Sequence, residues 1–252
     1  MSDHVTTSVK DGILTIRMDR PDKKNALTPE MYDAMSDAIN KAEKNPDVRV
    51  IMITGVGDSF TAGNDLKDFL ENPPTSKNSP VMNFLKAISE AKLPMVAAVN
   101  GTAVGVGVTM LLHCDFVYVA KDATLSLPFV NLGLVPEAAV SLLLPRIAGH
   151  QRASEMLMLG EPFTPKVAQE IGLANAVCEP ADLEATALKT AKKLAAKPRE
   201  ALRHTKALLR REFESVAQRI DAEAEIFEKC LKSDDAKEAF TAFKEKRKPK
   251  FN

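Results

Sequence analysis

Glu137 is a lone carboxylate in an apolar run, NLGLVPEAAVSLLLP, at 131–145. It is the only charged residue between Asp122 and Arg146. Two interpretations fit this position. Pro136 and Glu137 could open a helix, because proline suits the first turn and an acid there meets free N–H groups and the positive end of the helix dipole. Alternatively, Glu137 is a catalytic base in an apolar pocket, and that role needs support from elsewhere in the chain.

Two glycine-containing turns could supply a second chemical group. FTAGNDLK at 60–67 and NGTAVGVGV at 100–108 place small residues where a strand gives way to a helix. Such turns leave backbone N–H groups without partners. Two turns from adjacent strands could hold one oxygen atom between them, as an oxyanion hole does, although a glycine turn can equally serve tight packing. Neither turn fits the phosphate-loop pattern GxxxxGK[ST] or the dinucleotide fingerprint GxGxxG.

An alternation of strands and helices must position these residues. A hairpin with its turn at Asp11-Gly12 opens the chain, and an N-cap signal at Thr28-Pro29 predicts a helix. Alternation of strand and helix patterns indicates an α/β fold with parallel strands. After Lys197-Pro198 only helical patterns follow, which divides the chain into a core at 1–196 and a helical extension at 197–252. The apolar and β-branched runs predict strands at 48–54, 94–100, 115–120 and 123–127.

Composition narrows the class of protein. The 252 residues carry 34 basic and 34 acidic side chains, and 45% are hydrophobic, as in ordinary globular proteins. This charge balance gives no sign of nucleic-acid binding. Three scattered cysteines without a CxxC motif indicate a reducing compartment and no metal site. With neither a secretion signal nor an apolar segment of roughly 20 residues, the sequence predicts a cytoplasmic protein that does not cross a membrane.

Five segments resemble the crotonase, or enoyl-CoA hydratase/isomerase, superfamily in their order and spacing over nearly the whole chain. They are RPDKKNALT, FTAGNDLK, AAVNGTAVGVGV, NLGLVPEAAVSLLLPRIAG and AFTAFKEKRKPKF. The resemblance implies a spiral of ββα units and a helical C-terminal region that builds a homotrimer or a dimer of trimers. It also implies an acyl-CoA thioester as substrate, so that CoA arrives with the substrate and no separate cofactor is needed.

The resemblance also implies which residues bind the thioester. The backbone N–H groups of Asn64 and Val106 would hold the thioester oxygen as an enolate forms. Asn64 could instead cap the following helix, and the basic C-terminal run also fits a solvated helix end. The implied substrate-binding positions are Lys24, Ala26, Ala62 and Leu66 along the CoA, and Phe243 and Lys246 near the nucleotide end of a neighbouring subunit's ligand.

Two further positions bear on the reaction. Hydratases of this superfamily are expected to use two glutamates, and the matching positions here hold Thr109 and Phe129. Neither side chain can activate water, so hydratase activity is not expected. Glu137 resembles the single glutamate of the delta-3,delta-2-enoyl-CoA isomerase branch, where one base moves a proton from C2 to C4. Phe129 would then keep water away, and an apolar site would raise the pKa of Glu137 above its usual value of about 4.3.

Two other functions remain open from the sequence. The protein could be a different crotonase-type acyl-CoA enzyme, such as a hydratase with an atypical base, a thioesterase or a lyase. It could also be a scaffold that binds acyl-CoA or a protein partner without turnover. The missing carboxylates at Thr109 and Phe129 favour a scaffold, whereas the acid at Glu137 opposes it. His113 lies near a helix end with no partner evident in the sequence, and a structural role is expected for it.

Overall fold

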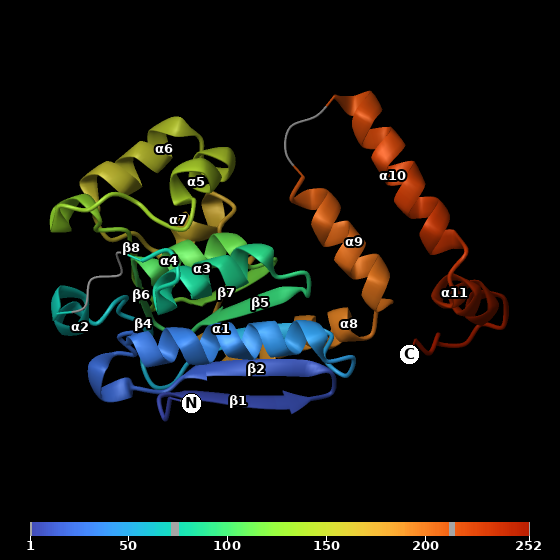
Figure 1. The fold of residues 1–252 in the computed structure, drawn as a ribbon, viewed down its shortest axis with the longest axis horizontal. Helices are drawn as coiled ribbons and strands as arrows, with labels where there is room; N and C mark the ends of the chain where they lie inside the picture. The colour runs from blue at the N-terminus through green and yellow to red at the C-terminus, as the bar shows by residue number, and fades with distance from the viewer. Residues whose placement is uncertain (1, 72–75, 212–214, 252) are drawn as a thin grey trace.

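The computed structural model describes residues 2–71, 76–211 and 215–251. Its centre is a six-stranded sheet in the order β1-β2-β3-β5-β7-β9 (Figure 1). Only β1 and β2 are antiparallel, and the other neighbours are parallel. β3 and β5 are buried along their whole length, as expected for parallel strands covered on both faces. The strands span Val5–Lys10 (β1), Ile13–Met18 (β2), Val50–Gly55 (β3), Met95–Val99 (β5), Phe116–Ala120 (β7) and Ala176–Cys178 (β9).

A second, smaller sheet holds the chain segments that follow the main strands. It consists of β4 (Ser59–Thr61), β6 (Thr102–Val104) and β8 (Leu125–Ser126), all parallel. Each of β3, β5 and β7 is followed by one of these short strands, which gives the expected repetition of ββα units. Since β4 and β6 are neighbours and parallel, the two glycine turns that follow them emerge at the same edge of this sheet.

Helices cover both sheets and end in a C-terminal extension. α1 (Pro29–Lys44) packs against α3 (Pro80–Glu90), and α8 (Pro180–Ala195) packs against β3, β5 and β7. The N-cap side chains of Thr28 and Ser79 accept hydrogen bonds from the first turns of α1 and α3. The remaining helical segments are η1 (Pro21–Lys23), α2 (Leu66–Glu71), α4 (Val106–Thr109), η2 (Met110–His113), η3 (Val130–Leu132), α5 (Val140–Ala148), α6 (His150–Ser154), η4 (Glu155–Leu159), α7 (Pro165–Glu170), α9 (Arg199–Leu209), α10 (Val216–Leu231) and α11 (Asp234–Lys244).

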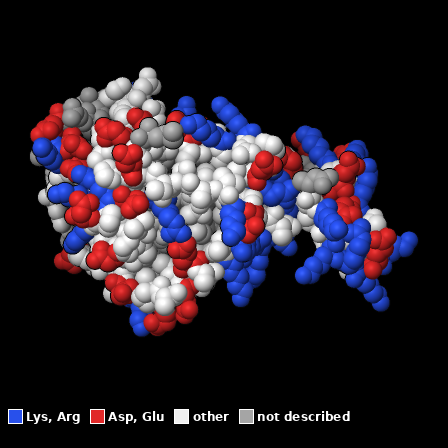
Figure 2. Space-filling view, turned by 90° about the horizontal axis from the view of Figure 1, so that it is seen from below, with Lys and Arg blue, Asp and Glu red and all other residues white. Residues whose placement is uncertain are grey.

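Helices α9 to α11 project from the core (Figure 1). α9 is fastened to it by Lys206, which is buried and whose Nζ donates to Leu93 O and Asp115 Oδ2, both at 2.7 Å. α10 and α11 lie farther out and expose several large apolar side chains. Charges of both signs are interspersed over the face of the molecule that Figure 2 shows, and Lys and Arg are frequent on the C-terminal extension. No helix in the described residues combines the length and apolar character needed to cross a bilayer.

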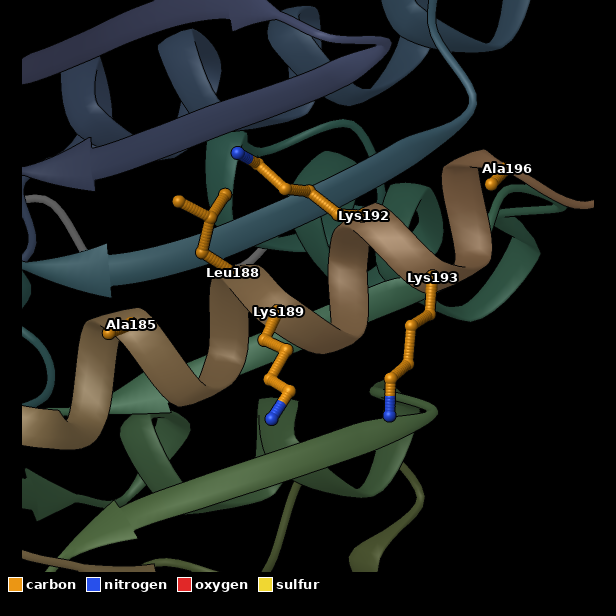
Figure 3. Close-up of a pocket in the computed structure, with 6 residues that line it drawn as sticks. All are labelled: Ala185, Leu188, Lys189, Lys192, Lys193 and Ala196. Atoms are coloured by element: carbon orange, nitrogen blue, oxygen red, sulfur yellow. The ribbon is translucent and has the colours of Figure 1, made fainter.

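The outer face of α8 carries a shallow hollow of about 540 Å³ (Figure 3). Its lining combines alkyl groups with three lysines. Lys189 and Lys193 point to one side, and Lys192 points to the other, where its Nζ lies 3.7 Å from Asp11 Oδ2 of the N-terminal hairpin. The residues that line this hollow include no carboxylate, and its lysines lie on an open helix face, so its chemistry is that of a solvated helix face.

Candidate active site

The first glycine turn presents the backbone of Asn64. A parallel bridge joins Asn64 to Leu27, with Leu27 N donating to Gly63 O at 2.8 Å and Asp65 N donating to Leu27 O at 2.9 Å. These hydrogen bonds use Gly63 O and Asp65 N, the backbone groups on either side of Asn64. The N–H of Asn64 itself donates to no protein group in the described part of the chain. The first turn therefore leaves one backbone donor free for a ligand.

The side chain of Asn64 does not cap the following helix. Asp65 takes that role, because its Oδ1 accepts from Lys67 N at 3.1 Å and from Asp68 N at 3.4 Å. Asn64 Oδ1 instead accepts a 2.5 Å hydrogen bond from the hydroxyl of Tyr32, a buried residue of α1. The capping interpretation of Asn64 is thus wrong, and α1 fixes the side chain of this residue.

Asn25 organises the loop that pairs with the first turn. It is fully buried with a left-handed φ of 55°, a conformation that asparagine tolerates better than most residues. Its Nδ2 donates to Ser59 O at 2.7 Å and to Val56 O at 2.9 Å, while its carbonyl accepts from Thr61 Oγ1 at 2.7 Å. This role of Asn25 was not predictable from residue spacing, because its only local signal is the preference of asparagine for left-handed turns.

The second glycine turn supplies the other backbone donor. Gly105 has φ 55° and ψ −113°, and α4 begins directly after it at Val106. As the first helical residue, Val106 has an N–H without an intrahelical partner, and no other described group accepts from it. Val106 is only 3% exposed, so this donor belongs to the interior of the protein.

Close backbone packing holds the two turns together. A β-carbon added at Gly63 would lie 2.9 Å from Val104 O, and one added at Gly107 would lie 2.7 Å from Thr61 Cγ2. Both distances are too short for the methyl group of an alanine. The missing side chains of Gly63, in the first turn, and Gly107, in the second, therefore allow the two turns to pack closely. The N–H groups of Asn64 and Val106 therefore come from two turns in direct contact.

The carboxylate of Glu137 is hydrogen-bonded to α4, the helix that begins at the second backbone donor, Val106. Its Oε1 accepts a 2.5 Å hydrogen bond from Thr109 Oγ1, at the end of α4. Its Oε2 is buried and has no hydrogen-bond partner among the described residues. Burial raises the pKa of Glu137, and the hydrogen bond from Thr109 partly offsets that rise because it favours the ionised form. One carboxylate oxygen is thus held by Thr109, and the other has no protein hydrogen-bond partner among the described residues.

The structure contradicts the helix-start interpretation of Pro136 and Glu137. α5 begins three residues after Glu137, at Val140, and the intervening Ala138 and Ala139 have φ values of 51° and 57°. For residues other than glycine this left-handed conformation costs roughly 1–2 kcal/mol each. Glu137 therefore precedes a strained turn instead of occupying a helix N-terminus. Strain of this kind is often found at functional sites.

The other predicted positions lie in three places: beside or directly after the first glycine turn, in the core, and at the end of α11. Ala62 N donates to Lys24 O at 2.9 Å, so the chain around Lys24 runs beside the first glycine turn. Phe129 is 8% exposed and belongs to the core. Phe243 and Lys246 lie at the end of α11, away from the 130–139 segment of the same chain (Figure 1). Ala26 is half-buried close to the first turn, and Leu66 is exposed at the start of α2.

The comparisons with known proteins define the class. The family model described as enoyl-CoA hydratase/isomerase matches residues 8–252, and the chain belongs to this family. A protein of Magnetospirillum magneticum AMB-1, described as a candidate enoyl-CoA hydratase/carnithine racemase, superposes with a TM-score of 0.96 at 48% identity, covering 99% of this chain and 98% of that one. The expected crotonase fold of ββα units with C-terminal helices is therefore confirmed.

Individual relatives carry different activities in their names. The 1,2-epoxyphenylacetyl-CoA isomerase of Escherichia coli (strain K12) is 30% identical over 259 residues, covering 100% of this chain and 99% of the relative. Enoyl-CoA delta isomerase 2 of Homo sapiens is 35% identical over 226 residues, covering 87% of this chain and 57% of the relative. An enoyl-CoA hydratase from Polaromonas sp. JS666 has a TM-score of 0.92 at 32% identity, covering 98% of this chain and 99% of that one. The family implies an acyl-CoA substrate, and the reaction must be argued from the site.

Proposed function

We propose that this protein is a delta-3,delta-2-enoyl-CoA isomerase with Glu137 as its single acid–base residue. The observation that carries the proposal is the asymmetry of this carboxylate: Oε1 is held by Thr109, and Oε2 is buried without a protein partner. A base in this environment has one oxygen aimed for proton transfer. Burial raises its pKa, which makes it a stronger base and brings the pKa closer to neutral pH, where a residue that both takes and returns a proton works best.

The reaction follows from these groups without an added reagent. Oε2 of Glu137 takes a proton from C2 of a 3-enoyl-CoA, and the electron pair of that C–H bond moves toward the thioester to form a dienolate. The N–H groups of Asn64 and Val106 stabilise the negative oxygen, each contributing about 3 kcal/mol. Glu137 then returns the proton to C4, leaving the double bond between C2 and C3. Atoms and charge balance, and no water takes part.

The absence of a second carboxylate supports isomerisation over hydration. The position of the first hydratase glutamate holds Thr109, whose hydroxyl is engaged with Glu137. The position of the second holds Phe129, a buried phenyl ring of the core. Addition of water needs a positioned base for the water and an acid for the carbon. Because neither of these two positions holds a carboxylate, the 2-enoyl product would not be hydrated efficiently.

The proposal also covers the organisation of the chain, its assembly, the CoA site and the cellular location. Residues 1–196 form the catalytic core, and residues 197–252 form an extension that assembles a homotrimer or a dimer of trimers. CoA lies along Lys24, Ala26, Ala62 and Leu66, while Phe243 and Lys246 serve the ligand of a neighbouring subunit. Three free cysteines support a reducing compartment, and we place the protein in the cytoplasm.

The test is the variant Glu137→Gln, which keeps the shape of the side chain and removes its basicity. Conversion of 3-hexenoyl-CoA to 2-hexenoyl-CoA should fall by about 10²–10⁴-fold, with the fold retained by circular dichroism. Glu161→Gln, at an exposed glutamate, is the matched control and should convert the substrate normally. Near-normal turnover in Glu137→Gln would refute the catalytic role of Glu137.

Rapid formation of 3-hydroxybutyryl-CoA from crotonyl-CoA would favour a hydratase, and tight acyl-CoA binding without any turnover would favour a scaffold.

A further inference from the structure

Helical residues 106–113 contact the Glu137 segment at two points. α4 (Val106–Thr109) continues directly into η2 (Met110–His113). Thr109 donates its hydroxyl to the Glu137 carboxylate, and His113 Nε2 lies 2.9 Å from the carbonyl oxygen of Ala138, the next residue along the chain. A carbonyl can only accept, so Nε2 carries the hydrogen and donates. One short helical run thus holds both the side chain of Glu137 and the backbone that follows it.

The backbone held by His113 has an unfavourable conformation. Ala138 and Ala139 are consecutive left-handed residues with side chains, and such a conformation persists only where surrounding contacts impose it. Val140 N donates to Glu137 O at 3.0 Å on the other side of the turn. A single hydrogen bond to the Ala138 carbonyl can therefore decide whether this turn is maintained. The turn also determines the direction of the Glu137 side chain.

His113 is itself firmly placed. It is 7% exposed, and its carbonyl accepts a 2.6 Å hydrogen bond from Arg210 Nη2 at the end of α9. Arg210 Nη1 also donates to Ser89 O at 3.1 Å and to Ala91 O at 3.2 Å. Burial lowers the pKa of the imidazole, and the nearby charges of Arg210 and Lys206 lower it further against the opposing effect of the Ala138 hydrogen bond. The lowered pKa favours the neutral ring, in which Nε2 is the single N–H donor.

We propose that His113 is a positioning residue for the reaction: its hydrogen bond to the Ala138 carbonyl maintains the left-handed turn and thereby aims Oε2 of Glu137 at the substrate. This inference rests on the proposed function of Glu137. It also links the C-terminal extension to the site, since Arg210 secures the backbone of His113. We assign His113, which is buried, no contact with the substrate, so its loss should lower the rate of the chemical step without weakening substrate binding.

The experiment compares His113→Gln with His113→Leu. The amide nitrogen of glutamine can replace Nε2 as a donor to Ala138 O, whereas leucine keeps bulk and provides no donor. A displacement of about 1 Å can cost about 10²-fold in rate, so His113→Leu should lower kcat by about 10–100-fold while KM changes less than about threefold. His113→Gln should keep kcat within about fivefold of the natural protein. Leu183→Ala, in the buried face of α8, is the control for lost stability and should leave kcat unchanged.

The outcomes separate this inference from the proposed function. Equal kcat values for the leucine and glutamine variants, or a rise in KM with kcat unchanged, would overturn the positioning role. If His113→Leu does not fold, His113→Asn replaces it, because its amide is too short to reach Ala138 O, and it must lose kcat where His113→Gln does not. An active Glu137→Gln variant would overturn the proposed function itself, whereas an inactive Glu137→Gln beside a fully active His113→Leu would overturn the positioning role alone.

Discussion

At the scale of single residues, the two oxygens of the Glu137 carboxylate have separate tasks. Oε1 receives the hydroxyl hydrogen of Thr109, and Oε2 is buried without a described partner. A hydrogen bond to the ionised form lowers a carboxyl pKa, and burial raises it. These opposing effects set the pH at which Glu137 can act as a base. Thr109, at the place of a hydratase glutamate, is therefore a direct modifier of the proposed catalytic residue.

Thr109→Val should shift the pH dependence of isomerisation. The variant keeps the shape of the side chain and removes the hydroxyl that favours ionised Glu137, so the pKa of Glu137 rises further. Since the ionised form is the base, the acid limb of the kcat/KM profile should move to higher pH by about one pH unit, the scale of one hydrogen bond to a charged group.

The measurement is kcat/KM against pH with a 3-enoyl-CoA for the natural protein, Thr109→Val and Thr109→Ser. Serine restores the hydroxyl, so Thr109→Ser should recover most of the natural profile. A shift of the acid limb to lower pH in Thr109→Val would contradict this account of how the hydroxyl acts on Glu137. The same limb in all three proteins would show that Thr109 does not influence the titrating base.

At the scale of elements, two short parallel strands bring the glycine turns together. β4 and β6 are three residues each, and their pairing places the N–H groups of Asn64 and Val106 at one sheet edge. The close approach depends on Gly107, where an added β-carbon would meet Thr61 Cγ2 at 2.7 Å and Thr61 O at 3.1 Å. The spacing of the two proposed oxyanion donors is therefore set by a contact that leaves no room for one methyl group.

Gly107→Ala should separate the two turns and impair catalysis. The added methyl must displace Thr61, whose Cγ2 it would meet at 2.7 Å and whose carbonyl oxygen it would meet at 3.1 Å, and loss of one oxyanion donor costs about 10²–10³-fold in kcat. Gly107→Ala should therefore lose about 10²-fold in turnover of a 3-enoyl-CoA, measured with saturating substrate. Adding Thr61→Ser removes the Cγ2 that the new methyl meets, so the double variant should regain part of the lost rate. A fully active Gly107→Ala would contradict the role of this contact.

Strands and helices could be predicted where their signals are local and long. The β-branched run VRVIMIT at 48–54 corresponds to β3 (Val50–Gly55), and the Asp11-Gly12 turn lies between β1 and β2 as expected. The short strands β4 and β6 were interpreted only as turns, because three residues carry too little periodicity to reveal pairing. The helix-start interpretation of Pro136 failed because distant contacts hold the left-handed turn at 138–139.

The site was predictable only in part for the same reason. Glu137 could be singled out because a charge in an apolar run is conspicuous in the sequence. Its partner Thr109 lies 28 residues away, and the Tyr32 contact to Asn64 spans 32 residues. No spacing rule connects such pairs, because they depend on how helices pack against loops that are distant in the sequence. The family resemblance indicated the positions of the proposed backbone donors, and the side-chain contacts around them became visible only in the structure.

At the scale of the whole molecule, the C-terminal extension exposes an apolar face. Val216, Ile220, Phe227 and Leu231 of α10 are 77%, 58%, 68% and 49% exposed. Their spacing places them on one side of the helix. A groove of about 570 Å³ between α9 and α10 includes Ile220 and Phe227 in its lining. Exposed apolar surface of this kind is typical of a subunit interface, which supports the proposed trimer.

Phe227→Asp should therefore weaken assembly without unfolding the core. A charge at the centre of a buried interface costs several kcal/mol unless it is paired, whereas on an exposed helix of the free chain it costs little. Sedimentation should show the natural protein at about three or six times the 27.4 kDa chain mass, and Phe227→Asp at the mass of one chain. Glu225→Ala, on the opposite side of α10, is the control and should assemble normally. A natural protein that sediments as a single chain would contradict the trimer, and an assembled Phe227→Asp would place the interface on another surface.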